Sequence, residues 1–166
     1  MLAALQVVSA ILVAVAMALA LAHALELPGK LRLSKEQYLA VQPIYYPGFT
    51  IGGLCEPLSL LFLVLLLLLL NDGTVFWLTA GAFASMLAMH GAYWLLTHPV
   101  NNFWLKDVQA KGLARSFFSF DPLSRIDDAG KLDWVALRNR WEFSHAIRAG
   151  FGLLGLVLLI TALAVG

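Results

Sequence analysis

Charged side chains are scarce in this chain. Asp, Glu, Lys and Arg together make up 13% of the 166 residues, while hydrophobic residues make up 61% and the mean hydropathy is +0.83. Soluble domains contain about 25% charged residues, so the composition excludes an ordinary soluble domain. It predicts an integral membrane protein whose first partner is the lipid bilayer. The net charge of +1 gives no reason to expect nucleic acid as a partner.

Cysteine is almost absent as well. Cys55 stands alone, which excludes an internal disulfide, and no CxxC or Cys/His spacing predicts a structural zinc site. No internal repeat is visible beyond the general similarity of four apolar runs. The sequence therefore predicts a single integral membrane domain over residues 1–166.

The four apolar runs are each long enough to cross the hydrocarbon core, which takes about 20 helical residues. The predicted spans cover about residues 3–25, 49–70, 75–96 and 141–165. Basic and aromatic residues mix after the first span and again from Phe103 to Asp133, as in segments that lie on the headgroup layer. The predicted fold is an all-α membrane protein, a four-transmembrane-helix bundle with a short interfacial segment after helix 1 and a long amphipathic cytoplasmic segment between helices 3 and 4.

Several residues predict where the helices begin and end. Pro28 and Gly29 should stop the first helix, and Pro99 should close the third. Ser34 and Asp133 are the expected N-caps of a short interfacial helix and of the last helix. The first run lacks the basic start of a secretory signal peptide, so we expect a retained spanning helix rather than a cleaved one.

Basic residues are distributed unevenly over the predicted loops. Three lie between the first and second spans and seven between Lys106 and Arg140, whereas none precedes the first span or separates the second from the third. Loops rich in Lys and Arg remain on the cytoplasmic side. We therefore expect a multi-pass protein of a prokaryotic plasma (inner) membrane, with both termini outside and the basic loops cytoplasmic.

The few ionisable side chains in or beside the spans fall toward the predicted cytoplasmic ends. A charged group inside hydrocarbon costs at least about 2.5 kcal/mol unless it faces the bundle interior and is paired. These residues should therefore meet in a shared buried cluster. The expected members are His23, Glu26, Glu56, His90, His98, Glu142, His145 and Arg148.

The spacing within this cluster predicts a metal site. Glu142 and His145 are three residues apart and share a helix face, as metal ligands do in helix bundles, and His23 with Glu26 repeats the spacing in reverse order. Oxygen and nitrogen ligands of this kind suit a transition metal such as iron, copper, manganese or zinc. The expected ligands are His23, Glu26, Glu56, His90, Glu142 and His145.

Two alternatives to a metal site follow from the same residues. His90 and His98 are candidate ligands of a bound cofactor, with haem less favoured than a metal ion, although His98 could also serve only as a cap at the interface. Alternatively, the polar groups only satisfy one another. In that case Glu56 and Arg148 form a buried ion pair that joins the second helix to the fourth.

The chain also carries longer motifs, His98-Pro99-Val100-Asn101, Trp134-x-x-Leu137-Arg138-x-Arg140-Trp141-Glu142-x-x-His145-x-x-Arg148 and Glu56-Pro57. In these it resembles the DUF1772 family, whose named members are anthrone oxygenases. The resemblance implies a small four-helix membrane protein, linked in some members to oxygenation of a phenolic polycycle. It implies site residues at Asn101, Glu142, His145 and Arg148. Residues 23–30 differ from what is expected of the anthrone enzymes, so their substrate is not transferred.

The sequence leaves two functions open. The first is an oxidoreductase or oxygenase acting on a hydrophobic phenolic or quinone-like small molecule that enters from lipid beneath Phe117 and Phe118. His145, oriented by Glu142, would then abstract the phenolic proton. The second is a non-catalytic accessory or structural subunit of a larger membrane complex, with membrane-protein partners or a homo-oligomer. Its packing surfaces would be the leucine-rich second helix and a glycine series on the fourth, Gly150, Gly152 and Gly155.

Overall fold

A computed structural model describes residues 2–104, 121, 123 and 133–166, and every regular element in these ranges is helical. The first two spans and the segment between them contain α1 (Leu2–Lys30), α2 (Lys35–Val41), the 3₁₀ helix η1 (Gln42–Tyr45), α3 (Gly48–Gly53) and α4 (Cys55–Leu69). The third and fourth contain α5 (Thr74–Ala92), the π-helical η2 (Tyr93–Thr97), α6 (His98–Trp104) and α9 (Trp134–Val165).

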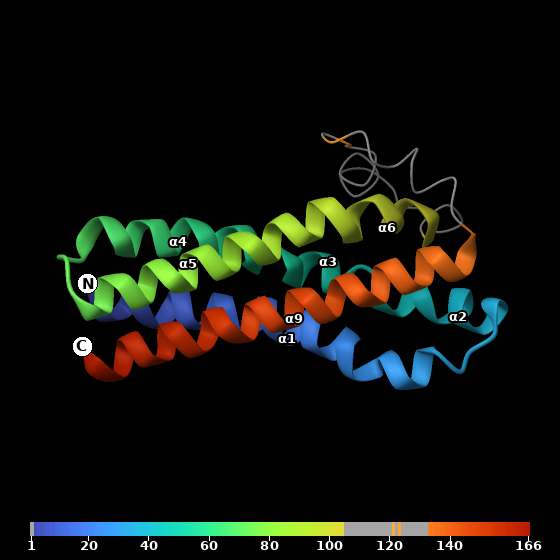
Figure 1. Cartoon of the computed structure of the whole chain (residues 1–166), viewed down its shortest axis with the longest axis horizontal. Coiled ribbons are helices and arrows are strands. Elements are labelled where there is room, and N and C mark those ends of the chain that lie inside the picture. Colours follow the sequence, from blue (N-terminus) through green and yellow to red (C-terminus); the bar gives the residue numbers. More distant parts are fainter. Residues whose placement is uncertain (1, 105–120, 122, 124–132) are drawn as a thin grey trace.

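Four helical rods are long and apolar enough to cross a membrane. They are Leu2–Lys30, Gly48–Leu69, Thr74–Asn101 and Trp134–Val165. The rods lie side by side along the long axis of the molecule, with both termini at one end (Figure 1). Helix α9 packs against α1 and α5, and α4 packs against the same two helices. The predicted all-α membrane bundle is therefore confirmed.

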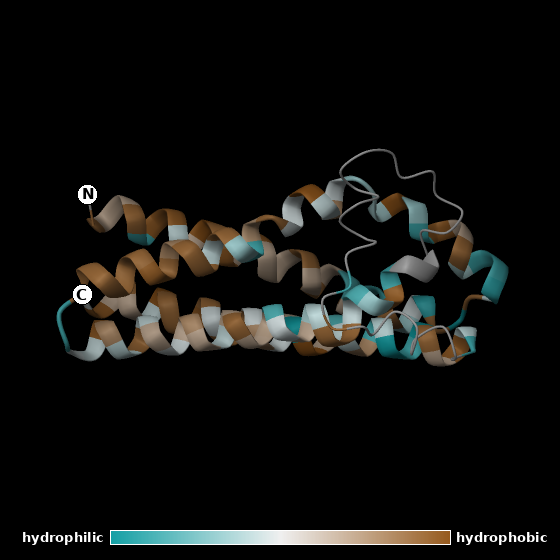
Figure 2. Ribbon diagram, turned by 90° about the horizontal axis from the view of Figure 1, so that it is seen from above, coloured by the Kyte–Doolittle hydropathy of each residue, from teal (hydrophilic) through white to brown (hydrophobic). Residues whose placement is uncertain are grey.

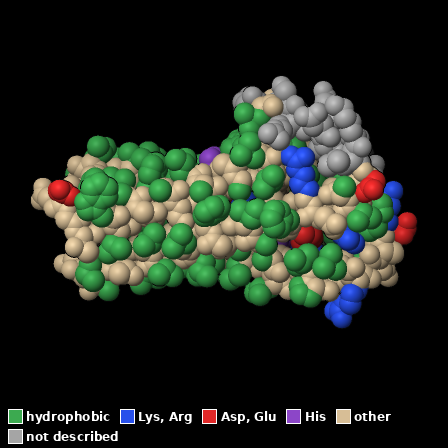
Figure 3. All heavy atoms as spheres, in the orientation of Figure 1, with side chains coloured by type: hydrophobic (Ala, Val, Ile, Leu, Met, Phe, Trp, Pro, Cys, Tyr) green, Lys and Arg blue, Asp and Glu red, His purple; other side chains and the backbone are tan. Residues whose placement is uncertain are grey.

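The two ends of the bundle differ in polarity. Figure 2 shows hydrophobic residues along the half that carries the termini and hydrophilic residues concentrated in the other half. On the face seen in Figure 3, apolar side chains cover the terminal half, while most of the visible Lys, Arg, Asp and Glu side chains gather at the opposite end. The expected concentration of polar groups at one end is thus present.

The predicted caps are confirmed. Ser34 forms a capping box, because its Oγ accepts a hydrogen bond from the Gln37 N–H while the Gln37 side chain accepts one from the Ser34 N–H. Asp133 caps α9 by accepting a hydrogen bond of 2.8 Å from the Ala136 N–H. Gly73 has a φ of 155° in the turn between α4 and α5, a conformation that glycine adopts at little cost.

The predicted end of the first helix is wrong. Helix α1 continues through Pro28 to Lys30, although Pro28 has no N–H to donate to the carbonyl four residues earlier. The last turn is stabilised by an ion pair between Glu26 and Lys30, whose Oε2 and Nζ atoms are 3.0 Å apart at a spacing of four residues. This contact supports the helical turn at Lys30, while His23 and Glu142 hold its ammonium inside the bundle.

Pro99 does not close the third helix either. The backbone widens into the π-helical turn η2 just before it, where the His98 N–H donates to the Tyr93 carbonyl five residues earlier. Pro99 cannot donate to the Leu95 carbonyl, and this carbonyl accepts a hydrogen bond of 2.8 Å from the Arg140 guanidinium. A side chain from α9 thus satisfies the carbonyl that the proline leaves without its usual donor, and the helix continues as α6.

The second span is interrupted at Leu54, between α3 and α4. Pro57 has no N–H for the Gly53 carbonyl, which favours a break at this point. A Cβ atom at Gly52 would lie 2.8 Å from the Leu19 side chain, so glycine permits α3 to approach α1 closely here. The break turns α3 relative to α4 beside the middle of the bundle.

Apolar side chains form two separate clusters. The larger fills the half of the bundle that carries the termini and includes Val13, Leu63 and Met86. The smaller lies toward the other end, around Tyr38 and Trp141. The candidate site lies where the two clusters adjoin, since Ala16 and Ala20 of the first and Tyr45 and Trp141 of the second line the same cavity.

Two sequence predictions concern other surfaces. Gly152 packs against Met17 and Gly155 against Met86 inside the chain, so these glycines serve contacts between its own helices. The predicted amphipathic segment between helices 3 and 4, with Phe117 and Phe118, lies outside the described residues apart from its ends and residues 121 and 123.

Candidate functional site

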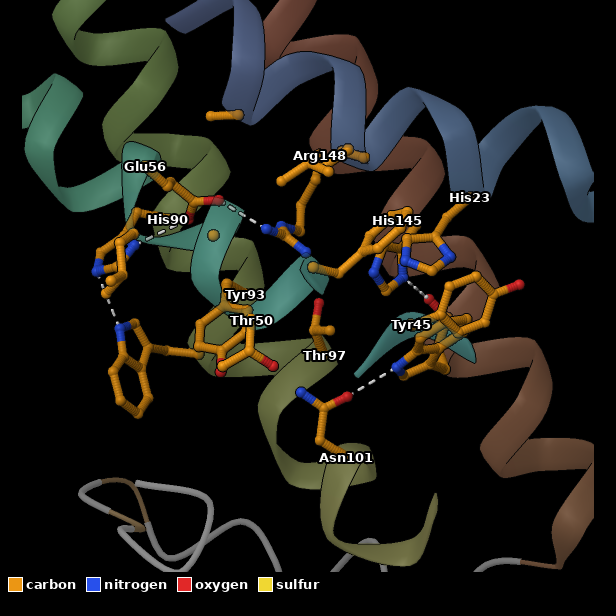
Figure 4. A pocket seen from close by; sticks show the side chains of 18 of the residues that line it. His23, Tyr45, Thr50, Glu56, His90, Tyr93, Thr97, Asn101, His145 and Arg148 are labelled. Carbon is orange, nitrogen blue, oxygen red and sulfur yellow. Dashed lines mark hydrogen bonds and ion pairs between the residues drawn. The ribbon is translucent and has the colours of Figure 1, made fainter. Parts of the chain in front are cut away.

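A cavity of about 330 Å³ lies within the bundle, and all four spans contribute to its wall (Figure 4). Six of the residues predicted from sequence line it, namely His23, Glu56, His90, Asn101, His145 and Arg148. Glu26, His98 and Glu142 do not line the cavity but lie behind its wall, within the same polar network. The structure therefore brings the expected residues together and divides them into separate groups.

The first group is centred on Glu56, which is 3% exposed. Its Oε2 accepts a hydrogen bond of 2.6 Å from Arg148 Nη2, and its Oε1 lies 2.9 Å from His90 Nδ1. The predicted ion pair between α4 and α9 is therefore confirmed. Glu56 is the one charged residue that α4 contributes to the cavity wall and Arg148 the one that α9 contributes, so the two charges neutralise each other.

The hydrogen bonds around His90 determine its tautomer. Trp94 Nε1 lies 3.0 Å from His90 Nε2, and an indole N–H can only donate. Nε2 must then carry a lone pair, so the proton sits on Nδ1 and is donated to Glu56. His90 is thus a neutral imidazole with both nitrogens engaged, and Glu56 and Arg148 balance each other's charge.

The second group is centred on Lys30, a residue that the sequence analysis did not select. Lys30 is 5% exposed, and its Nζ lies 3.0 Å from Glu26 Oε2 and 3.4 Å from Glu142 Oε1. The ammonium also lies over the rings of Tyr45 and Trp141, 4.9 and 5.0 Å from their centroids. Two carboxylates therefore share one buried cation.

Two tyrosines complete the second group. Tyr38 donates a hydrogen bond of 2.9 Å to Glu142, and Tyr45 donates one of 2.7 Å to Glu26. Burial, followed by the adjacent Glu142, raises the pKa of Tyr38, and burial together with the hydrogen bond to Glu26 raises the pKa of Tyr45. Both phenols therefore stay protonated and act as donors to the carboxylates.

Glu142 does not orient His145 as the sequence predicted. Its carboxylate bonds to Tyr38 and Lys30, whereas His145 Nδ1 lies 2.8 Å from the Trp141 carbonyl one turn earlier in the same helix. A carbonyl can only accept, so Nδ1 carries a proton. Burial beside the Arg148 guanidinium disfavours a second proton, so the neutral ring has its lone pair on Nε2. The backbone of α9 thus selects the tautomer that was attributed to the carboxylate.

The Nε2 lone pair of His145 is open to the cavity. No residue in the described ranges donates a hydrogen bond to this atom, and His145 is one of the residues that line the cavity. Figure 4 shows the imidazole between Arg148 and His23 at the cavity wall. The structure thus presents an unused base in a largely apolar space.

His23 presents the complementary group. Lys30 Nζ lies 3.2 Å from His23 Nδ1, and an ammonium can only donate, so Nδ1 is the acceptor and the neutral ring carries its proton on Nε2. The rings of His23 and His145 have centroids 4.2 Å apart. One donor and one acceptor therefore stand next to each other in the cavity.

Hydroxyl and amide groups fix the backbone behind His145. Ser144 donates a hydrogen bond of 2.6 Å to the Trp141 carbonyl. The Ser144 hydroxyl oxygen in turn accepts a hydrogen bond of 2.8 Å from the Thr97 hydroxyl. Asn101 accepts a hydrogen bond of 2.8 Å from the Trp141 indole, which holds the end of the third span against α9. Asn101 thus positions Trp141 and lines the cavity.

The predicted metal site is not assembled in this arrangement. The described residues contain no group of three or more His, Cys, Asp or Glu side chains that could hold a metal ion. Both nitrogens of His90 are engaged, and His98 Nδ1 lies 3.1 Å from the Tyr93 hydroxyl. Of the six expected ligands, His90 bonds to Glu56, while His23, Glu26 and Glu142 contact Lys30, and His145 bonds to the Trp141 carbonyl. The residues therefore do not fit a metal or haem site.

Sequence reasoning missed residues whose role depends on distant contacts. Lys30 gave one signal, because it follows Glu26 at the spacing of an intrahelical ion pair. Tyr38 and Tyr45 gave none, since aromatic residues beside a span are also typical membrane anchors. Their hydroxyls contact carboxylates of α9 and α1 only through the way the segment between the first two spans folds back.

Comparison of the chain with protein-family models, with curated proteins and with solved structures finds no match. The resemblance to the anthrone oxygenase family therefore stays a prediction. Four apolar helices identify the chain as a multi-pass integral membrane protein, and its function has to be argued from the cavity.

Proposed function

We propose that the cavity binds the polar ring of a lipid-soluble phenol or quinone, and that His145 takes the phenolic proton as the first step of an oxidoreductase reaction. The observation that supports this proposal is the open lone pair on His145 Nε2 inside the membrane-spanning bundle. A neutral imidazole of fixed tautomer within reach of a ligand hydroxyl is the arrangement of a general base.

The two histidines are complementary to one oxygen atom. A phenolic hydroxyl can donate to the lone pair of His145 and accept from the N–H of His23. A quinone carbonyl can accept from His23. The rest of the wall is mainly apolar, with Leu19, Phe49 and Pro57 among its residues, which suits a ring and an alkyl chain.

The charges and the volume favour a neutral ligand of modest size. Among the described residues of the wall, Arg148 is the one fixed cation, and Glu56 already balances its charge, so a carboxylate ligand would add an uncompensated negative charge. Its guanidinium still lies in the wall, where it can stabilise a phenolate once the proton has moved. A volume of about 330 Å³ is near the lower end of the range for small-molecule sites, which fits one or two rings.

The reaction proceeds by transfer of the hydroxyl proton to His145 Nε2, which leaves a phenolate and an imidazolium. A phenolate gives up electrons more readily than a phenol. The oxidant in this proposal is dioxygen, the co-reactant that the family resemblance implies. With a hydroquinone as the substrate, two electrons pass from the phenolate to dioxygen. The proton held on His145 and the proton of the second hydroxyl go to the reduced oxygen, so the products are a quinone and hydrogen peroxide.

Binding of 4-nitrophenol to the purified protein in detergent tests this proposal, because its phenolate absorbs visible light. We expect the wild-type protein to bind the probe and to increase its phenolate fraction at a given pH. The substitution His145→Ala should remove this increase, while His145→Gln should keep the fold without restoring the base. An unchanged phenolate fraction in both variants would contradict the proposed base.

A matched pair of glycine variants tests whether the probe occupies this cavity. Gly53 lines the cavity, and a Cβ atom there would meet nothing within 4 Å, so Gly53→Leu adds volume without a steric clash in the helix. Gly150 also has nothing within 4 Å but is exposed outside the cavity, which makes Gly150→Leu the control. Probe affinity should fall only for Gly53→Leu; an equal effect of both variants would place the probe elsewhere.

The accessory-subunit alternative predicts a different result. A purified chain without its complex would then bind neither the probe nor dioxygen-reactive phenols, and it would copurify with the same membrane proteins in stoichiometric amounts. The internal packing of Gly152 and Gly155 removes one of the surfaces that favoured this alternative.

A further inference from the structure

A buried ammonium connects the cavity to the outside of the bundle. Lys30 Nζ lies 3.2 Å from His23 Nδ1 on the cavity side and 3.0 Å from Glu26 Oε2 on the other. The Lys30 side chain is 6% exposed, whereas the Glu26 side chain is 44% exposed. Glu26 and Lys30 also line an open groove at the hydrophilic end of the bundle, beside Tyr45. The polar contacts therefore extend from an exposed carboxylate to an imidazole of the cavity.

We infer that Glu26, Lys30 and His23 form a proton path that supplies protons from the exposed groove to the ligand oxygen in the cavity. The inference deepens the proposed function and rests on it, because the ligand oxygen is the one held between His23 and His145. It assigns His145 and His23 opposite tasks, the first as the base and the second as the acid.

The polarity of the hydrogen bonds gives the direction of the path. Lys30 has only protons to donate, so it donates to His23 Nδ1. The neutral His23 ring then carries its own proton on Nε2, which has no acceptor among the described residues and faces the cavity that His23 lines. On the cavity side of Lys30 each donor therefore points inward, toward the ligand, while the Lys30 N–H that faces Glu26 points toward the groove.

The transfer balances as follows. His23 gives the proton on Nε2 to a ligand oxyanion and receives a proton from Lys30 on Nδ1, which changes its tautomer and leaves its charge at zero. Lys30 becomes a neutral amine and regains a proton from water at the exposed Glu26 carboxylate. The net change is one proton from water to the ligand oxygen, with hydroxide left in the groove and no electron transferred. His23 then carries its proton on Nδ1 and has to return to the Nε2 tautomer before the next transfer.

The charges around the path favour proton uptake. Two carboxylates share the single Lys30 ammonium, so the group carries a formal charge of −1 when both are ionised. In the low dielectric of a bundle interior a proton that enters such a group is attracted strongly. The titratable or charged side chains that face His23 and Lys30 come from every element packed against them. They are Glu26 of α1, Tyr38 of α2, Tyr45 of η1, and Glu142, His145 and Arg148 of α9.

The kinetics of proton exchange on bound 4-nitrophenol test the path. The protein is loaded with the phenolate at a pH above the pKa of the probe and mixed rapidly with acidic buffer, and the loss of phenolate absorbance is followed. We expect His23→Gln, Lys30→Met and Glu26→Gln each to slow this loss, by roughly 10²-fold for His23→Gln.

Two controls separate a proton path from a structural role. Glu36→Gln removes an exposed carboxylate at the same end of the bundle that contacts Ser34 rather than Lys30, and it should leave the rate unchanged. Imidazole added to His23→Ala should restore much of the rate, since a small base can replace a missing relay but cannot repair a misfolded bundle. Wild-type rates in all three path variants, or slow rates that imidazole does not rescue, would overturn the path. A wild-type protein that binds no probe would instead overturn the proposed function, and the path with it.

Discussion

At the scale of single residues, hydrogen-bond donors that cannot accept decide the chemistry of this bundle. The Trp94 indole and the Lys30 ammonium each donate to a histidine, and the Trp141 carbonyl accepts from a third. His90 and His23 each accept a hydrogen bond on one nitrogen and are therefore neutral, and burial beside Arg148 favours the neutral form of His145; neighbours set a different tautomer for each ring. His90 has no free nitrogen, His23 offers a proton, and His145 offers a lone pair. The proposed base at His145 and the proposed acid at His23 follow from these assignments.

The buried pair of Glu56 and Arg148 leads to a prediction about stability. The substitution Glu56→Leu should lower the free energy of unfolding by about 3–5 kcal/mol, because it leaves the Arg148 guanidinium buried without a counter-charge. The double variant Glu56→Leu with Arg148→Met should recover most of this loss, since no unpaired charge remains. Thermal unfolding in detergent measures both; equal losses in the single and the double variant would contradict the prediction.

At the scale of elements, irregular helices shape the cavity. The π-helical turn η2 supplies three wall residues in five positions, Tyr93, Trp94 and Thr97, and it precedes Pro99, which ended the helix in the sequence prediction. Residues on both sides of the break between α3 and α4 also line the cavity, with Thr50 and Gly53 before it and Glu56 after it. A regular α-helix would place the side chains of these regions at a constant angular spacing. The wall of the cavity therefore depends on the π-helical turn η2 and on the break between α3 and α4.

Close packing between α1 and α9 gives a prediction at the same scale. A Cβ atom at Gly152 would lie 3.0 Å from the Met17 Cβ and 3.1 Å from its Cα, so the two helices cannot accept a larger residue without separating. Gly152→Val should therefore lower the free energy of unfolding by about 1–3 kcal/mol. Gly150→Val, where nothing lies within 4 Å, is the matched control for the loss of glycine itself. Equal unfolding temperatures for the two variants would show that the contact is not tight.

At the scale of the whole molecule, the bundle is divided into an apolar half and a polar half. Val13, Leu63 and Met86 are fully buried in the first, and the described buried carboxylates lie in the second. The protein thus combines an apolar half with a polar half. The cavity in the polar half lies between the group centred on Glu56 and the group centred on Lys30. Such a division is what a site for an amphipathic molecule at the edge of a membrane requires.

The predicted orientation of the bundle can be tested directly. Cys55 is the only cysteine, so Cys55→Ala provides a background for single-cysteine variants. Asp72 lies in the exposed turn between α4 and α5, and Lys35 is exposed at the polar end. A membrane-impermeant maleimide applied to intact cells should label Asp72→Cys and leave Lys35→Cys unlabelled until the membrane is opened, because basic loops stay cytoplasmic. The reverse pattern would invert the orientation.

The sequence by itself determined the class of the molecule, the number of its spans, two helix caps and the gathering of its scarce ionisable groups. These features depend on hydrophobic length, on local hydrogen bonding and on the cost of an unpaired charge in lipid, all of which can be read along one chain. The pairing of Glu56 with Arg148 also followed, because two opposite charges at matching depth have few other partners.

Only the tertiary structure decided how those groups pair. Glu142 binds Lys30 and Tyr38 instead of His145, because the segment between the first two spans folds back and brings donors that no periodicity connects to α9. The helices pass through Pro28 and Pro99 because an ion pair and an arginine from another helix support the backbone there. Contacts between residues far apart in the chain select one partner from several of equal chemical merit, and spacing along a helix carries no information about that choice.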